Sequence, residues 1–157
     1  MNPTVLSALA QVLDREGIGY DVIPHERTET ARDEAAALGV RTGEVAKTLV
    51  VKTETGYARA VLPASERIDM HKLRDALDGG KEIRLATEDE LGRDYPEFEL
   101  GAVPPFGGRP DRVVVDSRLA GRESVVLEAG SHEQSLRIET KDLLALANAT
   151  VADLSAG

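Results

Sequence analysis

The segment Ala46-Lys47-Thr48-Leu49-Val50-Val51-Lys52 decides the fold, because it is the strongest strand candidate in the sequence. Most of its residues are apolar or β-branched, and such residues favour extended strands. The next residues, Thr53-Glu54-Thr55-Gly56, are typical of a turn. Residues 57–62 then form a second apolar run. We therefore predict an antiparallel β-hairpin over these segments.

Shorter elements are predicted on both sides of this hairpin. Thr30, Ser65 and Thr87 are candidate helix N-caps, and Thr87 has a capping-box partner in Glu90. The helix after Ser65 is expected to end at Gly79-Gly80. Further strands are expected at residues 20–24, 82–85, 113–115, 125–127 and 136–139, and further helices near both ends of the chain.

This order of elements indicates the fold class. About six strands mixed with four or five helices, without regular βαβ alternation, predict an α+β fold. We expect a mixed, barrel-like sheet with peripheral helices. The chain has no repeat and no linker long enough to separate two domains, so we expect one compact domain over residues 1–157.

Composition restricts the classes of partner. The net charge of −9 argues against broad binding to nucleic acid, which needs a basic face, although a local contact with one strand end remains open. No uncharged apolar run approaches the ~18 residues of a membrane span. The first residues do not resemble a signal peptide, and the chain has no cysteine. We therefore expect a cytoplasmic protein without a membrane partner or a thiol nucleophile.

Lys47 is the first candidate site residue. Its period-2 neighbours Leu49 and Val51 are apolar, so its side of the strand is expected to point inward. One interpretation is a strand-end lysine that extends its ammonium to solvent. The other is a lysine that lines a pocket, where it binds an anion or stabilises developing negative charge.

The loop Gly101-Ala102-Val103-Pro104-Pro105-Phe106-Gly107-Gly108 is the second candidate. Three glycines and two prolines in eight residues predict a stiff loop with unusual backbone angles. Such a loop can present backbone N–H groups to a carbonyl oxygen or an oxyanion. An ordinary wide turn is the alternative.

A third candidate, Gly130-Ser131-His132, follows directly on the strand at residues 125–127. Adjacent serine and histidine have poor geometry for a catalytic triad, so these residues are expected to supply hydrogen bonds at a pocket wall. His25 is a second polar candidate, whereas His71 is expected at the surface of a helix. Three histidines without metal-ligand spacing, in a chain without cysteine, predict no metal site.

Together these residues resemble the YbaK/aminoacyl-tRNA synthetase-associated domain family, which includes prolyl-tRNA editing deacylases. The resemblance covers roughly residues 17–154 and follows the family's order. Its most specific pieces are the Lys47-Thr48-Leu49 strand and the Gly-x-x-x-Pro element from Gly101 to Pro105. Other matching pieces are Tyr20 to His25, Val61-Leu62-Pro63, residues 69–77, Val113-Val114-Val115-Asp116, Glu128-Ala129-Gly130, Leu136-Arg137-Ile138 and Asp142-Leu143-Leu144.

The resemblance implies hydrolysis of the ester that joins a wrong amino acid to tRNA, without a metal or cofactor. By position, Lys47 corresponds to the family's essential lysine, and the loop from Gly101 to Pro105 to the segment that polarises the ester carbonyl. Catalytic roles are thus implied for Lys47, Gly101 and Pro105. Substrate-binding roles are implied for His25, Phe106, Gly107, Gly130, Ser131 and His132.

The resemblance also implies partners. These are the acceptor end of a mischarged tRNA, of the Ala- or Cys-tRNA(Pro) type, and an aminoacyl-tRNA synthetase. Glu133 and the net charge of −9 depart from the basic segment that family members often carry here, which argues against a strong grip on the RNA body. Two alternatives stay open: a non-catalytic domain that binds an aminoacyl end, a nucleotide end or a protein, and a hydrolase of another small acyl ester.

Overall fold

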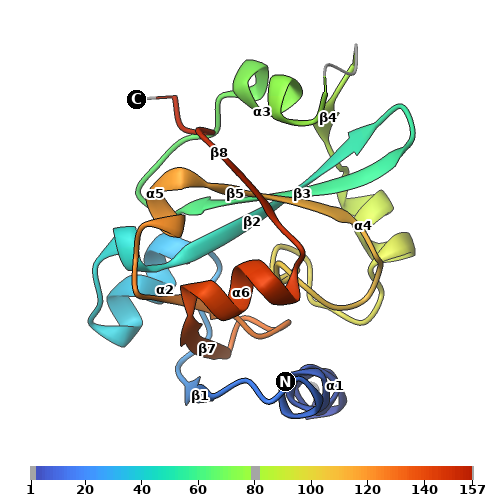
Figure 1. The fold of residues 1–157 in the computed structure, drawn as a ribbon. Helices are drawn as coiled ribbons and strands as arrows, with labels where there is room; N and C mark the ends of the chain where they lie inside the picture. The colour runs from blue at the N-terminus through green and yellow to red at the C-terminus, as the bar shows by residue number, and fades with distance from the viewer. Residues whose placement is uncertain (1–2, 79–81, 157) are drawn as a thin grey trace.

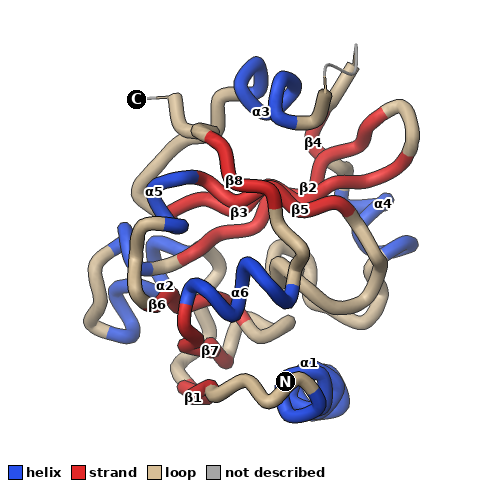
Figure 2. Tube along the Cα trace, viewed as in Figure 1, coloured by secondary structure: helices blue, strands red, loops and turns tan. Residues whose placement is uncertain are grey.

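A computed structural model describes residues 3–78 and 82–156 (Figure 1). Its strands form two sheets, which are seen as red segments in Figure 2. The strands are β1 (Tyr20–Pro24), β2 (Ala46–Thr53), β3 (Gly56–Pro63), β4 (Arg84–Leu85), β5 (Arg112–Asp116), β6 (Ser124–Glu128), β7 (Gln134–Glu139) and β8 (Thr150–Ala152). The helices are α1 (Pro3–Arg15), α2 (Ala31–Leu38), the 3₁₀ turn η1 (Thr42–Glu44), α3 (Met70–Ala76), α4 (Glu88–Asp94), α5 (Ser117–Ala120) and α6 (Thr140–Leu146).

The predicted hairpin is confirmed as the centre of the larger sheet. Strands β2 and β3 pair antiparallel from Ala46 opposite Pro63 to Thr53 opposite Gly56. Strand β4 pairs antiparallel with β2, while β5 pairs parallel with β3 and β8 parallel with β5. The larger sheet, in the order β4-β2-β3-β5-β8, is therefore mixed, as the sequence predicted.

The smaller sheet has the order β1-β7-β6, and both of its pairings are antiparallel. Within the described residues, a bridge between Val45 and Val126 connects the two sheets, which do not close into a barrel there. The predicted α+β class is confirmed. In place of one barrel-like sheet, the strands form two sheets that pack against each other.

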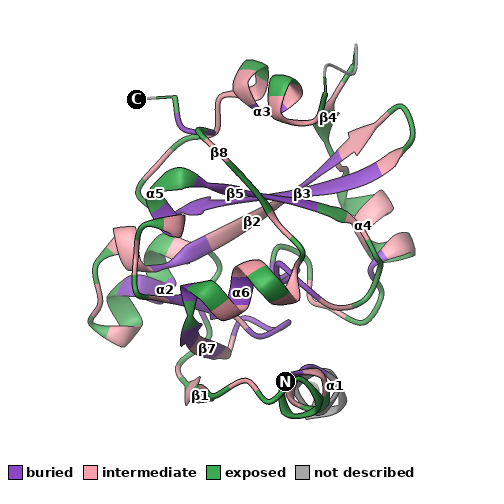
Figure 3. Cartoon of the chain, viewed as in Figure 1, coloured by how far each residue is buried: buried purple, intermediate pink, exposed green. Residues whose placement is uncertain are grey.

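The two faces of the larger sheet are covered differently (Figure 1). Helix α3 packs Leu73 against one face, next to Val51 and Val114. The other face meets the smaller sheet and helices α1 and α6, and β3 and β5 are buried for most of their length (Figure 3). Each fully buried aliphatic side chain contributes about 1.5–3 kcal/mol. The main core comprises Leu9, Leu13, Ala46, Val61, Phe106, Val113, Val115, Leu119, Val125, Leu127, Ala129, Leu136, Ile138 and Leu143.

Two of the predicted helix starts are confirmed by their caps. The Thr30 side chain accepts a hydrogen bond from the backbone of the first turn of α2, and α2 ends at Gly39, where φ is 69°. Thr87 and Glu90 form the predicted capping box of α4. Both signals are local, because a cap needs only a side chain and the backbone of the adjacent turn.

The predicted start of α3 at Ser65 is wrong. Ser65 lies in a turn, Ile68 bridges to Ser155, and the Asp69 carboxylate accepts from two backbone N–H groups to cap α3. The pairing of Ile68 with a residue near the C-terminus keeps this segment extended. The expected helix end at Gly79-Gly80 lies outside the described residues. Among the helices that the structure describes, none has the length and apolar character needed to cross a bilayer.

Candidate functional site

A pocket of about 280 Å³ brings together segments that are far apart in the sequence. Residues 46–50 of β2 run along it, and Thr30 and Ala31 at the start of α2 form part of its lining. The loop after α4 adds Gly101, Val103 and Pro104, and the end of β6 adds Glu128. The lysine strand and the glycine-proline loop therefore share one cavity.

Lys47 lies half-buried in this lining. Its Nζ atom donates a hydrogen bond to the carbonyl oxygen of Glu66, just beyond the end of β3. Partial burial lowers the pKa of Lys47, the positive charge of Arg32 lowers it further, and the Glu66 carboxylate opposes both. Because the hydrogen-bond acceptor is a neutral carbonyl, this bond leaves the positive charge of the ammonium uncancelled.

The loop is stiff because a buried arginine on β3 holds it. Arg59 is 1% exposed, and its guanidinium donates to the carbonyl oxygens of Pro104 at 2.8 Å and Gly107 at 2.7 Å. Its Nε atom donates to Asp111 at 3.1 Å. The backbone at Gly101 and Gly107 has φ of 81° and 89°, which favours glycine. Sequence reasoning missed Arg59, although a lone arginine inside an apolar strand is a usable signal.

The segment Gly130-Ser131-His132 packs against the loop from outside the pocket. His132 is 2% exposed, and its Nε2 atom donates to the Leu100 carbonyl oxygen at 2.6 Å. Its backbone N–H donates to the Glu99 carboxylate at 3.0 Å. The buried Ser131 hydroxyl accepts from a neighbouring backbone N–H. In the described part of the chain these residues hold the start of the loop and are not in the pocket lining.

The remaining site residues expected from the sequence lie away from the lining of the described pocket. His25 hydrogen-bonds through Nε2 to the Ser135 hydroxyl at 2.9 Å. Phe106 belongs to the main core, and Pro105 is buried beside it. Gly107 accepts the Arg59 hydrogen bond. The structure thus brings Lys47 and Gly101 together, with Pro105 and Gly107 as neighbours in the supporting loop.

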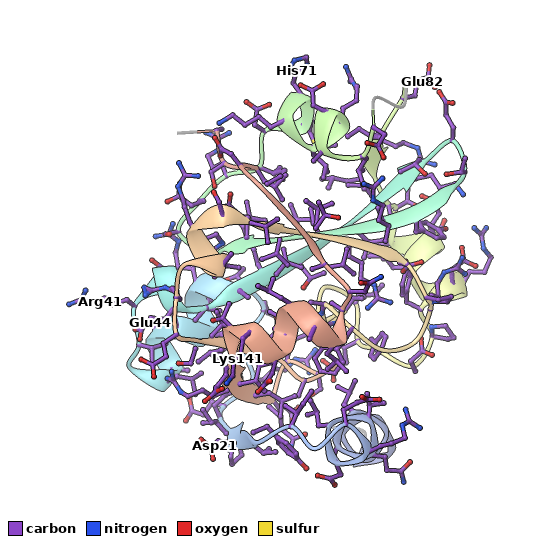
Figure 4. The ribbon with its side chains drawn as sticks, in the orientation of Figure 1. Asp21, Arg41, Glu44, His71, Glu82 and Lys141 are labelled. Atoms are coloured by element: carbon purple, nitrogen blue, oxygen red, sulfur yellow. The ribbon has the colours of Figure 1, made fainter. Side chains whose placement is uncertain are left out.

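The surface position expected for His71 is confirmed. Its side chain is 76% exposed and points outward from α3 (Figure 4). No group of three or more histidine, aspartate or glutamate side chains within residues 3–78 and 82–156 is placed to hold a metal ion.

Glu128 is a pocket residue whose role sequence reasoning missed. Its side chain is 11% exposed, and its Oε2 atom lies 2.8 Å from Nδ1 of His132. Burial raises the pKa of Glu128 to about 9, and the negative charges of Glu34, Glu99 and Glu29 act in the same direction. The sequence signal was an acidic residue that follows three apolar residues at the end of a strand.

The sequence profile of the aminoacyl-tRNA editing domain matches residues 25–146. The chain belongs to this family. The resemblance to YbaK-type domains is thereby confirmed, and the editing domain includes the strand, the loop and the acid that line the pocket.

Individual relatives agree with this assignment. The editing domain is 27% identical over 117 residues to a proline–tRNA ligase of Fervidobacterium nodosum, covering 74% of this chain and 20% of the ligase. The chain therefore spans about a fifth of that relative's length. It is 26% identical over 138 residues to the Enterococcus faecalis protein named "Putative Cys-tRNA(Pro)/Cys-tRNA(Cys) deacylase EbsC", covering 87% of this chain and 83% of that protein.

Solved structures show the same fold. One, described as "a putative trans-editing enzyme for prolyl tRNA synthetase", superimposes with a TM-score of 0.88 at 31% identity and covers 100% of this chain and 99% of its own. Another, the hypothetical protein APE2540, gives a TM-score of 0.85 at 28% identity, covering 94% of this chain and 99% of its own.

Proposed function

We propose that this editing domain hydrolyses the ester bond of a mischarged aminoacyl-tRNA, with Ala- or Cys-tRNA(Pro) as the substrate. The observation that carries the proposal is that Lys47 and Gly101 line one pocket of about 280 Å³. The names of the E. faecalis relative and of the structurally similar trans-editing enzyme support this choice of substrate. We further propose that residues 1–157 act as one unit, with an aminoacyl-tRNA synthetase as a second partner.

The proposed reaction needs stabilisation of negative charge. A water oxygen attacks the ester carbonyl carbon, and the carbonyl electron pair moves to its oxygen. The carbonyl then reforms, and the ribose oxygen leaves with a proton. Preorganised donors aimed at the developing oxyanion contribute about 3 kcal/mol each. The loop held by Arg59 provides a rigid backbone for this role, and Lys47 supplies positive charge for the oxyanion or for the terminal nucleotide phosphate.

The proposed selectivity for small amino acids follows from the pocket walls. Ala31, Ala46, Leu49 and Val103 make much of the lining apolar. A wall of this kind distinguishes side chains by size, and each methylene changes binding by about 1–3 kcal/mol. The same small difference in binding free energy limits how well a synthetase selects its amino acid, so hydrolysis at a second site makes aminoacylation more accurate.

A deacylation panel tests the proposal. Release of amino acid is measured from alanyl-, cysteinyl- and prolyl-tRNA(Pro) and from other mischarged tRNAs. We expect release of alanine or cysteine, and Lys47→Ala should lower the rate by about 10²–10³ because charge stabilisation is lost. Lys141→Ala is the matched control, since Lys141 is 81% exposed and lies on the outer face of α6 (Figure 4).

The outcomes separate the alternatives. No release from any charged tRNA overturns the proposal. Binding of charged tRNA without turnover indicates a non-catalytic binding domain. Faster cleavage of free amino-acid esters than of charged tRNA indicates a general small-ester hydrolase. Unchanged activity in Lys47→Ala contradicts the role assigned to that lysine.

A further inference from the structure

Glu128 brings a mostly buried carboxyl group into the lining of the pocket. Its Oε2 atom lies 2.8 Å from Nδ1 of His132, and neither atom has a hydrogen-bond partner elsewhere among the described residues. A carboxyl oxygen in a mainly apolar lining requires a polar partner, which a ligand can supply.

The contact between Glu128 and His132 contains one shared proton. Nε2 of His132 faces the Leu100 carbonyl oxygen, which can only accept, so Nε2 carries a hydrogen. At 2.8 Å, a carboxylate oxygen and an unprotonated Nδ1 would repel, so one of them is protonated. The pair is therefore either a carboxylic acid with a neutral imidazole or a carboxylate with an imidazolium.

The surroundings of Glu128 favour a cationic ligand. The negative charges of Glu34, Glu99 and Glu29 reach this carboxyl, and Arg27 opposes them only in part. Arg27 itself is bound to Glu29 at 3.0 Å and to Glu99 at 3.2 Å. Lys47 supplies the positive charge of the lining from β2. The pocket is thus polarised, with a cation on β2 and an acidic group at the end of β6.

We propose that Glu128 is the subsite for the free α-amino group of the aminoacyl ester. An aminoacyl ester carries this amino group on the carbon next to its reacting carbonyl. The pocket that holds the carbonyl near Gly101 therefore has to accommodate an amine close by, and Glu128 lines the same pocket. This inference rests on the proposed function, because it assigns one part of that substrate.

The proton balance of this contact is simple. With the pKa of Glu128 at about 9, the empty carboxyl holds its proton at neutral pH. An amine that arrives as an ammonium favours the carboxylate form of Glu128. The shared proton then lies on Nδ1 of His132, so the carboxylate oxygen still faces a donor at 2.8 Å and no proton has to leave the site.

Binding and turnover are measured for Glu128→Gln, which keeps the shape of the side chain without its charge. We expect kcat/KM for alanyl-tRNA(Pro) to fall by about 10- to 100-fold, with most of the loss in KM. N-acetylalanyl-tRNA(Pro), which has no basic amine, should be a poor substrate for both proteins at similar rates. Glu139→Gln is the control, because Glu139 is 55% exposed on β7.

A second measurement does not depend on hydrolysis. The probe is 3′-alanylamino-3′-deoxyadenosine, in which an amide replaces the ester, with its N-acetyl derivative as the comparison. Titration calorimetry on the wild-type protein should show at least tenfold tighter binding of the free amine. This preference should disappear in Glu128→Gln.

Each result decides between named possibilities. Amine preference in binding without any tRNA deacylation supports the subsite and overturns the proposed function. Equal binding of the two probes to the wild-type protein, or no binding of either, overturns the subsite even if deacylation occurs. A loss confined to kcat and equal for both tRNA substrates overturns amine recognition in favour of proton transfer to or from water by Glu128.

Discussion

Arg59 offers the most direct test of how the fold supports the site. Its guanidinium is buried and holds three carbonyl oxygens of the loop, those of Pro104, Gly107 and Arg109, together with the Asp111 carboxylate. Arg59→Met keeps the length and apolar stem of the side chain but removes every donor. Asp111 then stays 5% exposed without its main cation.

The expected loss of stability is large. Removing one partner of a buried ion pair costs about 3–5 kcal/mol, and among the described residues Asp111 would keep only the more distant, partly exposed Arg109 at 3.4 Å and the Tyr95 hydroxyl as partners. Domains of this size are stable by about 5–15 kcal/mol, so the variant should fold at low temperature but unfold at markedly lower urea concentration. Backbone amides of the loop should also exchange with solvent faster. Deacylation should lose kcat more than KM, since Arg59 acts only by positioning the loop.

Urea unfolding by far-UV circular dichroism and hydrogen exchange measure these effects. Arg112→Met is the matched control, because Arg112 pairs with Asp78 at 2.9 Å on the surface and such pairs contribute about 0–1 kcal/mol. If Arg59→Met is no less stable than Arg112→Met, or if loop exchange is unchanged, the buried arginine does not hold the loop and this reasoning fails.

Two further predictions concern buried Glu34 and strained Gly107. Burial raises the pKa of Glu34 from 4.5 to about 7, so the folded state holds its proton more tightly than the unfolded state. This group's contribution to stability therefore falls as pH rises from about 4.5 to 7, by about 3 kcal/mol. Urea unfolding across this range should give a flatter profile for Glu34→Gln, and superimposable profiles would contradict the shift. Gly107→Ala should lower stability by about 1–3 kcal/mol, because φ is 89° and the new Cβ would lie 2.9 Å from Leu9. Gly92→Ala in α4 has open space, so its thermal midpoint should not fall, and an equal fall in both variants would refute the strain argument.

The parts of the fold that the sequence predicted well are those with local causes. The β2–β3 hairpin needed only two apolar runs and a turn, and the N-cap at Thr30 began α2 as expected. Helix α5 and strand β8 were missed. Strand β8 has only three residues, and it is extended because it pairs with β5. Its partner strand lies more than thirty residues away in the sequence, so no local pattern predicts strand β8.

The candidate site divides in the same way. The pattern of the strand singled out Lys47, and the glycine-proline composition singled out the loop that begins at Gly101. His132 was expected at a pocket wall but lies buried behind the loop. Arg59 and Glu128 were missed because the role of a charged residue in a strand depends on the groups it contacts, and these groups lie far away in the sequence.

The amino-acid sequence by itself determined the helix starts at Thr30 and Thr87, the β2–β3 turn, the stiffness of the loop and the choice of Lys47 and Gly101 as candidate site residues. Those properties depend on backbone preferences and on neighbours within a few residues. Only the tertiary structure decided that Lys47, Gly101 and Glu128 line one pocket, and that Arg59 holds the loop through the Pro104 carbonyl. The physical reason is that desolvation and charge pairing depend on distance in space, which strand pairing across the two sheets sets.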